Sequence, residues 1–143
     1  MRRQRLRRRG PVRVVAAGTF DGIHAGHRHY LRTARNLGDH LTVIVARDAT
    51  VPIVKGKRPR RNERQRRLEV AKLPGVDRAI LGRHVRAAHP EARFKILLRL
   101  RPDVICLGYD QPVKTRQLRS FLDRNGMHRA RIVRAKKAPD RSS

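Results

Sequence analysis

The chain has 143 residues, enough for one domain with a single hydrophobic core and too few for two. It carries 37 lysine and arginine residues against 11 acidic ones, a formal net charge of +26, so its surface attracts polyanions at low salt. The sequence has no apolar run of membrane-spanning length and does not begin like a secretory signal, so we expect a cytoplasmic protein that crosses no membrane.

Residues 1–10 are dominated by arginine. Blocks of like charge repel one another and commonly stay disordered, so we expect a basic disordered arm followed by a folded domain over residues 11–143. A polyanion-binding role for this arm, including non-specific contact with nucleic acid, is the alternative. Only 3% of the residues are aromatic, too few for the stacking platform of a dedicated nucleic-acid-binding module.

The next segment combines a buried strand with a helix start. Residues 12–17 are mostly valine and alanine, as in a buried parallel strand, and this run ends at Gly18. A helix over residues 25–37 follows, with one apolar face and with Gly38 as its stop. Because the first turn of a helix leaves backbone N–H groups unpaired at its positive end, such a unit suits an anion, for example a phosphate.

Two histidines make this turn a candidate catalytic site. His24 and His27 are three residues apart, so they lie on the same side of the first helical turn. Gly22 and Gly26 lack side chains and allow a phosphate to approach the backbone. We expect the two imidazoles to flank that phosphate and to stabilise the charge that gathers on its oxygens during transfer. As metal ligands they would need a third partner at a recognised spacing, which the neighbouring residues do not offer, so we expect no metal bound by the protein itself.

Four more apolar runs are typical of buried strands, and helices alternate with them. The predicted strands are residues 41–46, 78–81, 104–107 and 130–133. The predicted helices are residues 62–73, a segment from Pro90 to the residue before Pro102, and residues 113–125. This alternation favours an α/β fold around a parallel sheet. Cys106, the one cysteine, falls in an apolar strand, which excludes an internal disulfide and agrees with a reducing compartment.

Residues 49–62, after the second strand, are rich in proline, lysine and arginine. Pro52 and Pro59 exclude a regular helix across this stretch, so we expect a mobile basic loop. Two interpretations stay open for it. It is either a solvated loop or a lid whose Lys55 and Lys57 neutralise a triphosphate.

The helix after this loop has Asn62 as its expected N-cap. Three of its residues, Arg64, Arg66 and Arg67, are basic within one short stretch. We expect a solvated basic face, with binding of a phosphate or of a partner subunit as the alternative.

Residues 108–111 follow the fourth strand and therefore lie at the same edge of a parallel sheet as the histidine turn. A nucleoside is expected between the two. Asp110 is positioned to accept a hydrogen bond from a ribose or a base, and Tyr109 to pack beside a ring. The alternative is a helix N-cap carboxylate next to a half-exposed tyrosine.

Residues 18–27 read GTFDGIHAGH and resemble the signature G-T-F-D-x-x-H-x-G-H of the nucleotidyltransferase superfamily, which includes glycerol-3-phosphate cytidylyltransferase and archaeal-type FAD synthase. Every fixed position matches. Agreement with the FAD synthase branch extends to residues 45–48, 55–59, 76–82 and 107–111. We expect a single Rossmann-like, doubly wound α/β domain with a five-stranded parallel sheet in the order 3-2-1-4-5.

The resemblance implies an adenylyltransferase that converts ATP and FMN to FAD and diphosphate. A divalent metal, magnesium or cobalt, would be carried with the nucleotide phosphates. A CTP-dependent cytidylyltransferase acting on glycerol 3-phosphate or a similar polyol or sugar phosphate is the alternative. A non-enzymatic protein that binds polyanions or nucleic acid is the third reading.

Carried over to this sequence, the resemblance assigns roles to eight residues. The expected catalytic residues are His24, His27 and Lys55. The expected nucleotide contacts are Thr19, Phe20, His24, Ala25, Gly26, His27 and Asp110. Related enzymes have a further serine- and threonine-rich turn and helix that would begin near residues 141–143, so we assign no triphosphate contact there. A neighbouring subunit that completes the site, in a homodimer, is one alternative.

Overall fold

The computed structural model describes residues 10–139, so the expected basic arm lies, except for Gly10, outside the described residues. Five parallel strands form one sheet in the order β3-β2-β1-β4-β5, which confirms the predicted topology. The strands are β1 (Arg13–Gly18), β2 (His40–Val45), β3 (Arg78–Leu81), β4 (Val104–Leu107) and β5 (Arg131–Arg134). Each strand begins and ends within one residue of the predicted bounds.

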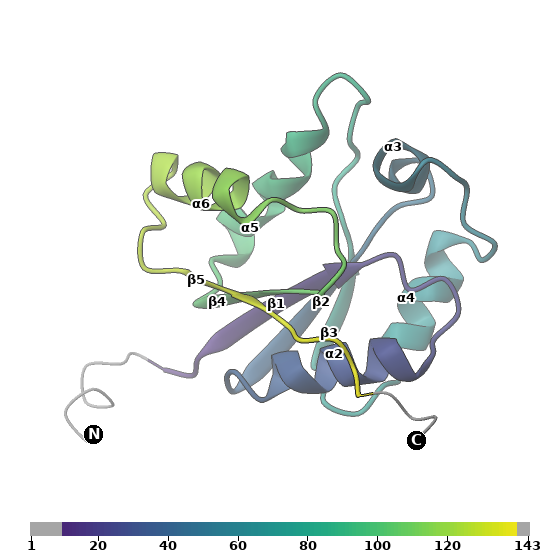
Figure 1. Cartoon of the computed structure of the whole chain (residues 1–143), viewed down its shortest axis with the longest axis horizontal. Helices are drawn as coiled ribbons and strands as arrows, with labels where there is room; N and C mark the ends of the chain where they lie inside the picture. Colours follow the sequence, from purple (N-terminus) through teal and green to yellow (C-terminus); the bar gives the residue numbers. More distant parts are fainter. Residues whose placement is uncertain (1–9, 140–143) are drawn as a thin grey trace.

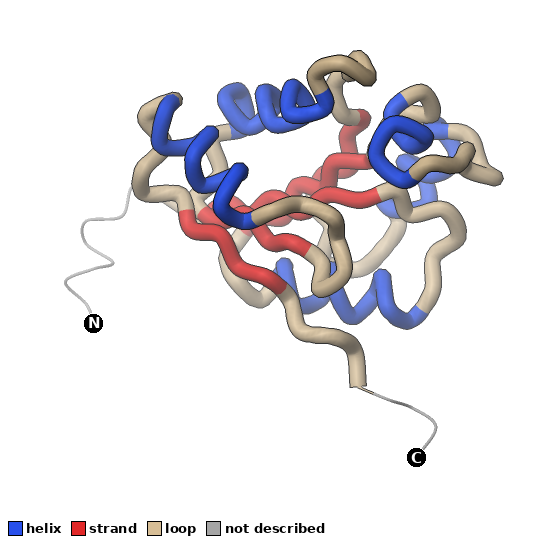
Figure 2. Tube along the Cα trace, turned by 45° about the horizontal axis from the view of Figure 1, so that its top comes forward, coloured by secondary structure: helices blue, strands red, loops and turns tan. Residues whose placement is uncertain are grey.

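Helices cover both faces of this sheet (Figure 1). On one face lie α2 (Ala25–Arg35) and α4 (Glu63–Ala71); on the other lie α5 (Ile96–Leu100), preceded by the 3₁₀ helix η1 (Pro90–Lys95), and α6 (Thr115–Arg124). Figure 2 shows the strands enclosed between these helical layers. Among the described residues, no helix has both the length and the apolar character needed to cross a membrane.

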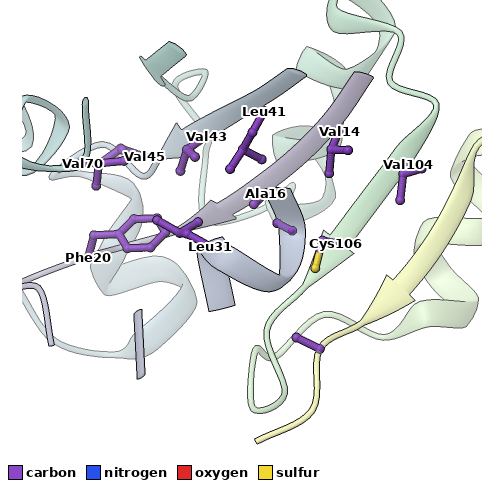
Figure 3. Close-up of a cluster of buried hydrophobic side chains, with 12 residues drawn as sticks. Val14, Ala16, Phe20, Leu31, Leu41, Val43, Val45, Val70, Val104 and Cys106 are labelled. Carbon is purple, nitrogen blue, oxygen red and sulfur yellow. The ribbon is translucent and has the colours of Figure 1, made fainter. Parts of the chain in front are cut away.

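The hydrophobic core is divided into two clusters by the sheet. Val14 and Ala16 of β1 belong to the cluster that includes Leu31 of α2 (Figure 3). Val15, between them, belongs to the second cluster with Leu97 and residues of α6. Alternate side chains of β1 are therefore buried on opposite faces, which explains why the strand is apolar after its exposed first residue, Arg13, rather than alternating with polar residues.

The segment after β2 is not the irregular loop that its prolines predict. Residues Thr50–Lys55 form a short helix, α3, which ends at Gly56 with φ of 80°. Pro52 is the third residue of α3, and the N–H groups of a first turn have no partner within the helix, so its missing N–H costs no hydrogen bond. The expectation of a mobile loop was wrong for these six residues because a proline interrupts a helix only beyond its first turn.

Gly38 was expected to stop the first helix, but it has a different role. The helix α2 ends at Arg35, and Asn36 is its C-cap in a right-handed conformation. A Cβ atom on Gly38 would lie 2.7 Å from Val14 Cγ2 and 2.8 Å from the Val12 carbonyl oxygen. The glycine is therefore required by the close approach of this turn to the start of β1.

The predicted N-cap of α4 is confirmed. Asn62 Oδ1 accepts from Gln65 N at 2.8 Å, and Gln65 Oε1 accepts from Asn62 N at 3.1 Å, a reciprocal capping box. Glu63 in the first turn also accepts from Asp48 N at 2.8 Å and pairs with Arg47 at 3.4 Å. These contacts fix the carboxyl end of β2 against the start of α4.

Candidate active site

A cavity of about 580 Å³ opens at the carboxyl ends of β1, β2 and β4. Its floor is apolar and is formed by sheet residues together with residues of η1, α5 and α6. Five of the predicted site residues line it: Thr19, Phe20, His27, Lys55 and Asp110. These residues come from three separate connections of the chain. The other three, His24, Ala25 and Gly26, lie beside the cavity at the start of α2.

The turn between β1 and α2 holds Phe20 in a strained backbone conformation. Its φ of 54° lies in the left-handed region, which costs a non-glycine residue about 1–2 kcal/mol. Its ring is buried in the core (Figure 3), with its centroid 6.5 Å from that of the nearly parallel Tyr30 ring and 5.2 Å from that of His27. The buried Phe20 ring therefore packs against the His27 ring from the core side. Strained backbone conformations such as that of Phe20 are often found at functional sites.

The two histidines cap α2 with their own side chains. His24 is the N-cap and its Nδ1 accepts from Gly26 N at 3.1 Å, while His27 Nδ1 accepts from His24 N at 3.2 Å. Their ring centroids are 3.8 Å apart and the ring planes differ by 26°. Since Nδ1 accepts in both rings, the neutral form of each carries its proton on Nε2. The cap therefore uses Nδ1 of both rings, and Nε2–H is the donor that each neutral ring can offer.

This geometry changes the expected part of the helix amides. The Gly26 amide donates to His24 Nδ1, so this N–H group is not free to bind an anion. A Cβ atom on Gly26 would lie 3.0 Å from His24 Cε1, so glycine is needed here for the imidazole to pack over the helix start. The smallness of Gly26 serves the histidine rather than the phosphate.

His27 is neutral at physiological pH. Burial, followed by repulsion from His24 and Lys55, lowers the pKa of His27 to about 4. The carboxylate of Asp110 acts in the opposite direction and does not compensate. A neutral imidazole donates a hydrogen bond from Nε2 without needing a counterion, so His27 is suited to stabilising charge on a phosphate oxygen.

Tyr30 closes the gap between β1 and β4, where the strand order reverses. Its hydroxyl accepts from Ala17 N at 3.1 Å and donates to the carbonyl oxygen of Cys106 at 2.6 Å. Burial strongly raises the pKa of Tyr30, so the hydroxyl stays protonated. Sequence reasoning placed Tyr30 on an apolar helix face and missed this role, although a buried tyrosine hydroxyl normally has a polar partner.

The loop after β4 is held rigidly beside the cavity. Gln111 accepts from Gly108 N at 2.9 Å and donates to the Ala17 carbonyl at 3.1 Å, and Arg134 of β5 donates to the Gly108 carbonyl at 2.9 Å. Asp110 lines the cavity from this loop. The alternative of an N-cap role for Asp110 was wrong, because α6 begins five residues later with Lys114 as its N-cap. Tyr109 is half-exposed outside the cavity lining.

Arg66 does not belong to a solvated basic face. Its side chain is fully buried and donates to the carbonyl oxygens of Thr19, Ala46 and Arg61 at 2.8–2.9 Å. Its charge is balanced by Asp48 at 2.8 Å. Arg66 thus joins the ends of β1 and β2 to the basic segment before α4. The prediction of a solvated face holds for its exposed neighbour Arg64.

Two aspartates, Asp21 and Asp77, accept hydrogen bonds from the backbone and have structural roles. Asp21 accepts from the backbone N–H groups of Arg60 and Arg61 at 2.7 and 2.9 Å, and these hydrogen bonds lower the pKa of Asp21 against the opposing effect of desolvation. Asp77 accepts from Leu41 N at 2.8 Å, which ties the start of β2 to the turn before β3. Within residues 10–139, no three His, Cys, Asp or Glu side chains gather as candidate metal ligands.

Basic side chains from several elements surround the cavity. Besides Lys55 of α3, they are Arg47, Lys57, Arg83 and Arg93. Sequence reasoning missed Arg83 and Arg93, because nothing in their spacing distinguishes them among 37 basic residues. Only the fold shows that the connection between β3 and β4 brings them to the same cavity as His27.

Comparison with known proteins agrees with this geometry. The Cytidylyltransferase-like family model matches residues 15–143. FAD synthase from Aciduliprofundum boonei is 44% identical over 90% of this chain and 81% of that protein, and FAD synthase from Thermoplasma acidophilum is 46% identical over 88% and 83%. A crystal structure described as a lipopolysaccharide core biosynthesis protein from Thermoplasma volcanium is 41% identical with a TM-score of 0.81, over 91% of this chain and 100% of that one. With its sheet order, its histidine-capped helix and this agreement over most of its length, the chain belongs to the cytidylyltransferase-like family.

Proposed function

We propose that this protein is an FAD synthase, an adenylyltransferase that joins ATP and FMN to give FAD and diphosphate. The observation that carries the proposal is the stacked pair of imidazoles at the start of α2, in which both Nδ1 atoms are used by the helix cap and His27 lines the cavity. The fold alone is equally compatible with CTP. Similarity to FAD synthases at 40–46% identity selects ATP and FMN as substrates.

In the reaction, an oxygen of the FMN phosphate attacks the α-phosphorus of ATP. A phosphoanhydride bond forms, the bond from the α-phosphorus to the bridging oxygen breaks, and diphosphate leaves with that electron pair. The FMN phosphate is already an anion at neutral pH, so the step needs positioning and charge stabilisation rather than a strong general base.

We assign the charge stabilisation to His24 and His27, whose Nε2–H groups donate to oxygens of the α-phosphate. Loss of one donor of this kind typically costs about 2.7–4 kcal/mol, or roughly 100- to 1,000-fold in rate. Ala25 and Gly26 form the helix start on which the pair is mounted. Phe20 supports His27 from the core side, 5.2 Å away between ring centroids.

The remaining ATP contacts come from the other connections. Lys55 at the end of α3 neutralises the leaving diphosphate, Thr19 shapes the crevice beside it, and Asp110 accepts a hydrogen bond from the ribose or the base. Magnesium or cobalt enters with the nucleotide phosphates, since the described residues offer no cluster of three metal-ligating side chains.

The test is a matrix of substrates with the purified protein. ATP or CTP is combined with FMN or glycerol 3-phosphate, each with magnesium or cobalt, and diphosphate release is followed alongside the product. We expect turnover with ATP and FMN only, with FAD as the product. His27→Ala should lower the rate roughly 100- to 1,000-fold while the circular dichroism spectrum stays unchanged.

Two results would contradict the proposal. Turnover with CTP and glycerol 3-phosphate would instead identify a cytidylyltransferase. Absence of diphosphate from every pairing, together with RNA or DNA binding that persists at physiological salt, would indicate a polyanion-binding protein.

A further inference from the structure

Arg93 contributes a cation to the cavity wall that no part of the described chain neutralises. Its guanidinium lies over the Phe94 ring, 5.2 Å from the centroid, and it lines the same cavity as His27. Its Nε atom is buried, and no hydrogen-bond acceptor for it exists within residues 10–139. A buried donor without a partner costs about 1–3 kcal/mol, so such a group calls for an explanation.

The neighbouring cavity residues do not supply the missing acceptor. Arg47 is already engaged, donating to the Gly82 carbonyl at 2.7 Å and pairing with Glu63. Arg83, Lys55 and Lys57 are further cations. Burial lowers the pKa of Arg93, yet an arginine stays protonated in proteins. The wall formed by the β3–β4 connection therefore presents positive charge without a counterion, as expected of an anion-binding surface.

The floor beneath Arg93 is apolar. Phe94 and Ile96 from the η1–α5 segment, together with Leu97 and with Ile105 of β4, line the cavity on this side. A ligand that satisfies both surfaces has an anionic group attached to a large apolar body. The contacts assigned to the nucleoside triphosphate come from the β1–α2 turn, α3 and the loop after β4, which leaves this wall for the second substrate.

We propose that Arg93 binds the phosphate of the acceptor, while the apolar ring system of the acceptor packs on the floor beneath η1 and α5. This inference rests on the proposed function, in which the acceptor is FMN. Arginine binds phosphate through a planar fork of two N–H groups, which holds two oxygens and leaves the third directed toward the α-phosphorus. Arg93 is thus a specificity residue that distinguishes a phosphorylated flavin from an unphosphorylated one.

The test compares FMN with riboflavin, which has the same ring and no phosphate. Binding of each to the full chain is measured by flavin fluorescence without ATP, for the wild type, Arg93→Met, Arg93→Lys and Arg99→Met. Arg99 is exposed on α5 outside the cavity, so Arg99→Met removes the same charge from the same region without touching the site. Thermal unfolding checks that each variant is folded; if Arg93→Met is not, Arg93→Gln takes its place.

Arg93→Met should weaken FMN binding about 10- to 100-fold, the range for a charge-assisted hydrogen bond, and leave riboflavin binding unchanged. The FMN affinity of Arg93→Lys should lie between those of Arg93→Met and the wild type, and the FMN affinity of Arg99→Met should match that of the wild type. In turnover, the KM for FMN should rise while the KM for ATP stays constant.

Equal weakening of FMN and riboflavin, or an equal effect of Arg99→Met, would overturn the assignment, because the first indicates packing and the second general electrostatics. These outcomes are separable from a failure of the proposed function. If the wild type makes FAD and Arg93→Met keeps the preference for FMN, the inference alone falls. If the wild type makes no FAD, the proposed function falls and the inference falls with it.

Discussion

The pKa of His27 is set by its surroundings, which leads to a quantitative prediction about stability at low pH. Burial, then His24 and Lys55, lowers this pKa from 6.5 to about 4. One pKa unit corresponds to about 1.4 kcal/mol, so the shift amounts to about 3 kcal/mol before screening. Because the side chain is only partly buried, we expect about 1.5–2 kcal/mol to remain.

The sign follows from the protonation states of the folded and unfolded chains. The folded pKa of His27 is below the unfolded one, so the unfolded chain takes up a proton first as the pH falls. The free energy of unfolding is therefore at its full value above pH 6.5 and decreases as the pH falls from 6.5 toward 4. The control is His27→Gln, which retains a hydrogen-bond donor but does not titrate.

The assay is urea unfolding between pH 7.5 and pH 4. The wild type should lose about 1.5–2 kcal/mol relative to His27→Gln across this range. NMR titration of the His27 ring should give a midpoint near 4. A midpoint between 6 and 7 would refute the reasoning, because the ring would then be a cation over part of the physiological range and not a fixed neutral donor.

Four further substitutions test the framework of the site through unfolding in urea. Arg66→Met should lower the free energy of unfolding by about 2–4 kcal/mol, because three carbonyl oxygens lose their donor. Asp48→Asn should lower it less, since that carboxylate is 44% exposed. Equal losses would contradict the role assigned to Arg66. Tyr30→Phe should cost about 1–3 kcal/mol, because the Ala17 N–H loses its acceptor; a neutral result would show that water replaces the hydroxyl. Gly38→Ala should cost about 1–3 kcal/mol through overpacking; if this glycine only stopped a helix, alanine would be neutral or stabilising.

The strands and the helix starts could be predicted because they depend on local patterns. A strand buried on both faces must be apolar throughout, which marks residues 12–17 directly, and the N-cap role of Asn62 follows from the residue type next to a helical segment. The closeness of the two imidazoles was likewise predictable, since both belong to one turn, and their role as a site stays a prediction. What the sequence leaves open there is the use of Nδ1 in the cap, which decides the tautomer.

Arginine is where sequence reasoning failed, because burial of a charge depends on partners that are distant in the chain. The acceptors of Arg66 are the carbonyls of Thr19 and Ala46, 47 and 20 residues away. One signal was available: Arg66 is four residues before the buried Val70, on the same face of α4. Arg93 had no such signal, since the 3₁₀ geometry of η1 and the cavity beneath it exist only in the folded protein.

The charges around the site bear on two separate tasks, which are binding of the phosphates and stabilisation of the transition state. In the proposed function, cations of the cavity such as Lys55 and Arg93 attract the phosphates, and any anion feels this attraction, which weakens with salt. Burial, with repulsion from His24 and Lys55, lowers the pKa of His27 to about 4, so in the proposed function this ring meets the α-phosphate as an uncharged donor and acts through hydrogen-bond direction. A cation in the place of His27 would bind the substrate and the transition state almost equally. A fixed neutral donor instead favours the geometry in which charge moves onto the phosphate oxygens. In the proposed function, the surrounding positive charge therefore raises the affinity for the substrates, and selectivity for the transition state comes from the neutral His27 ring.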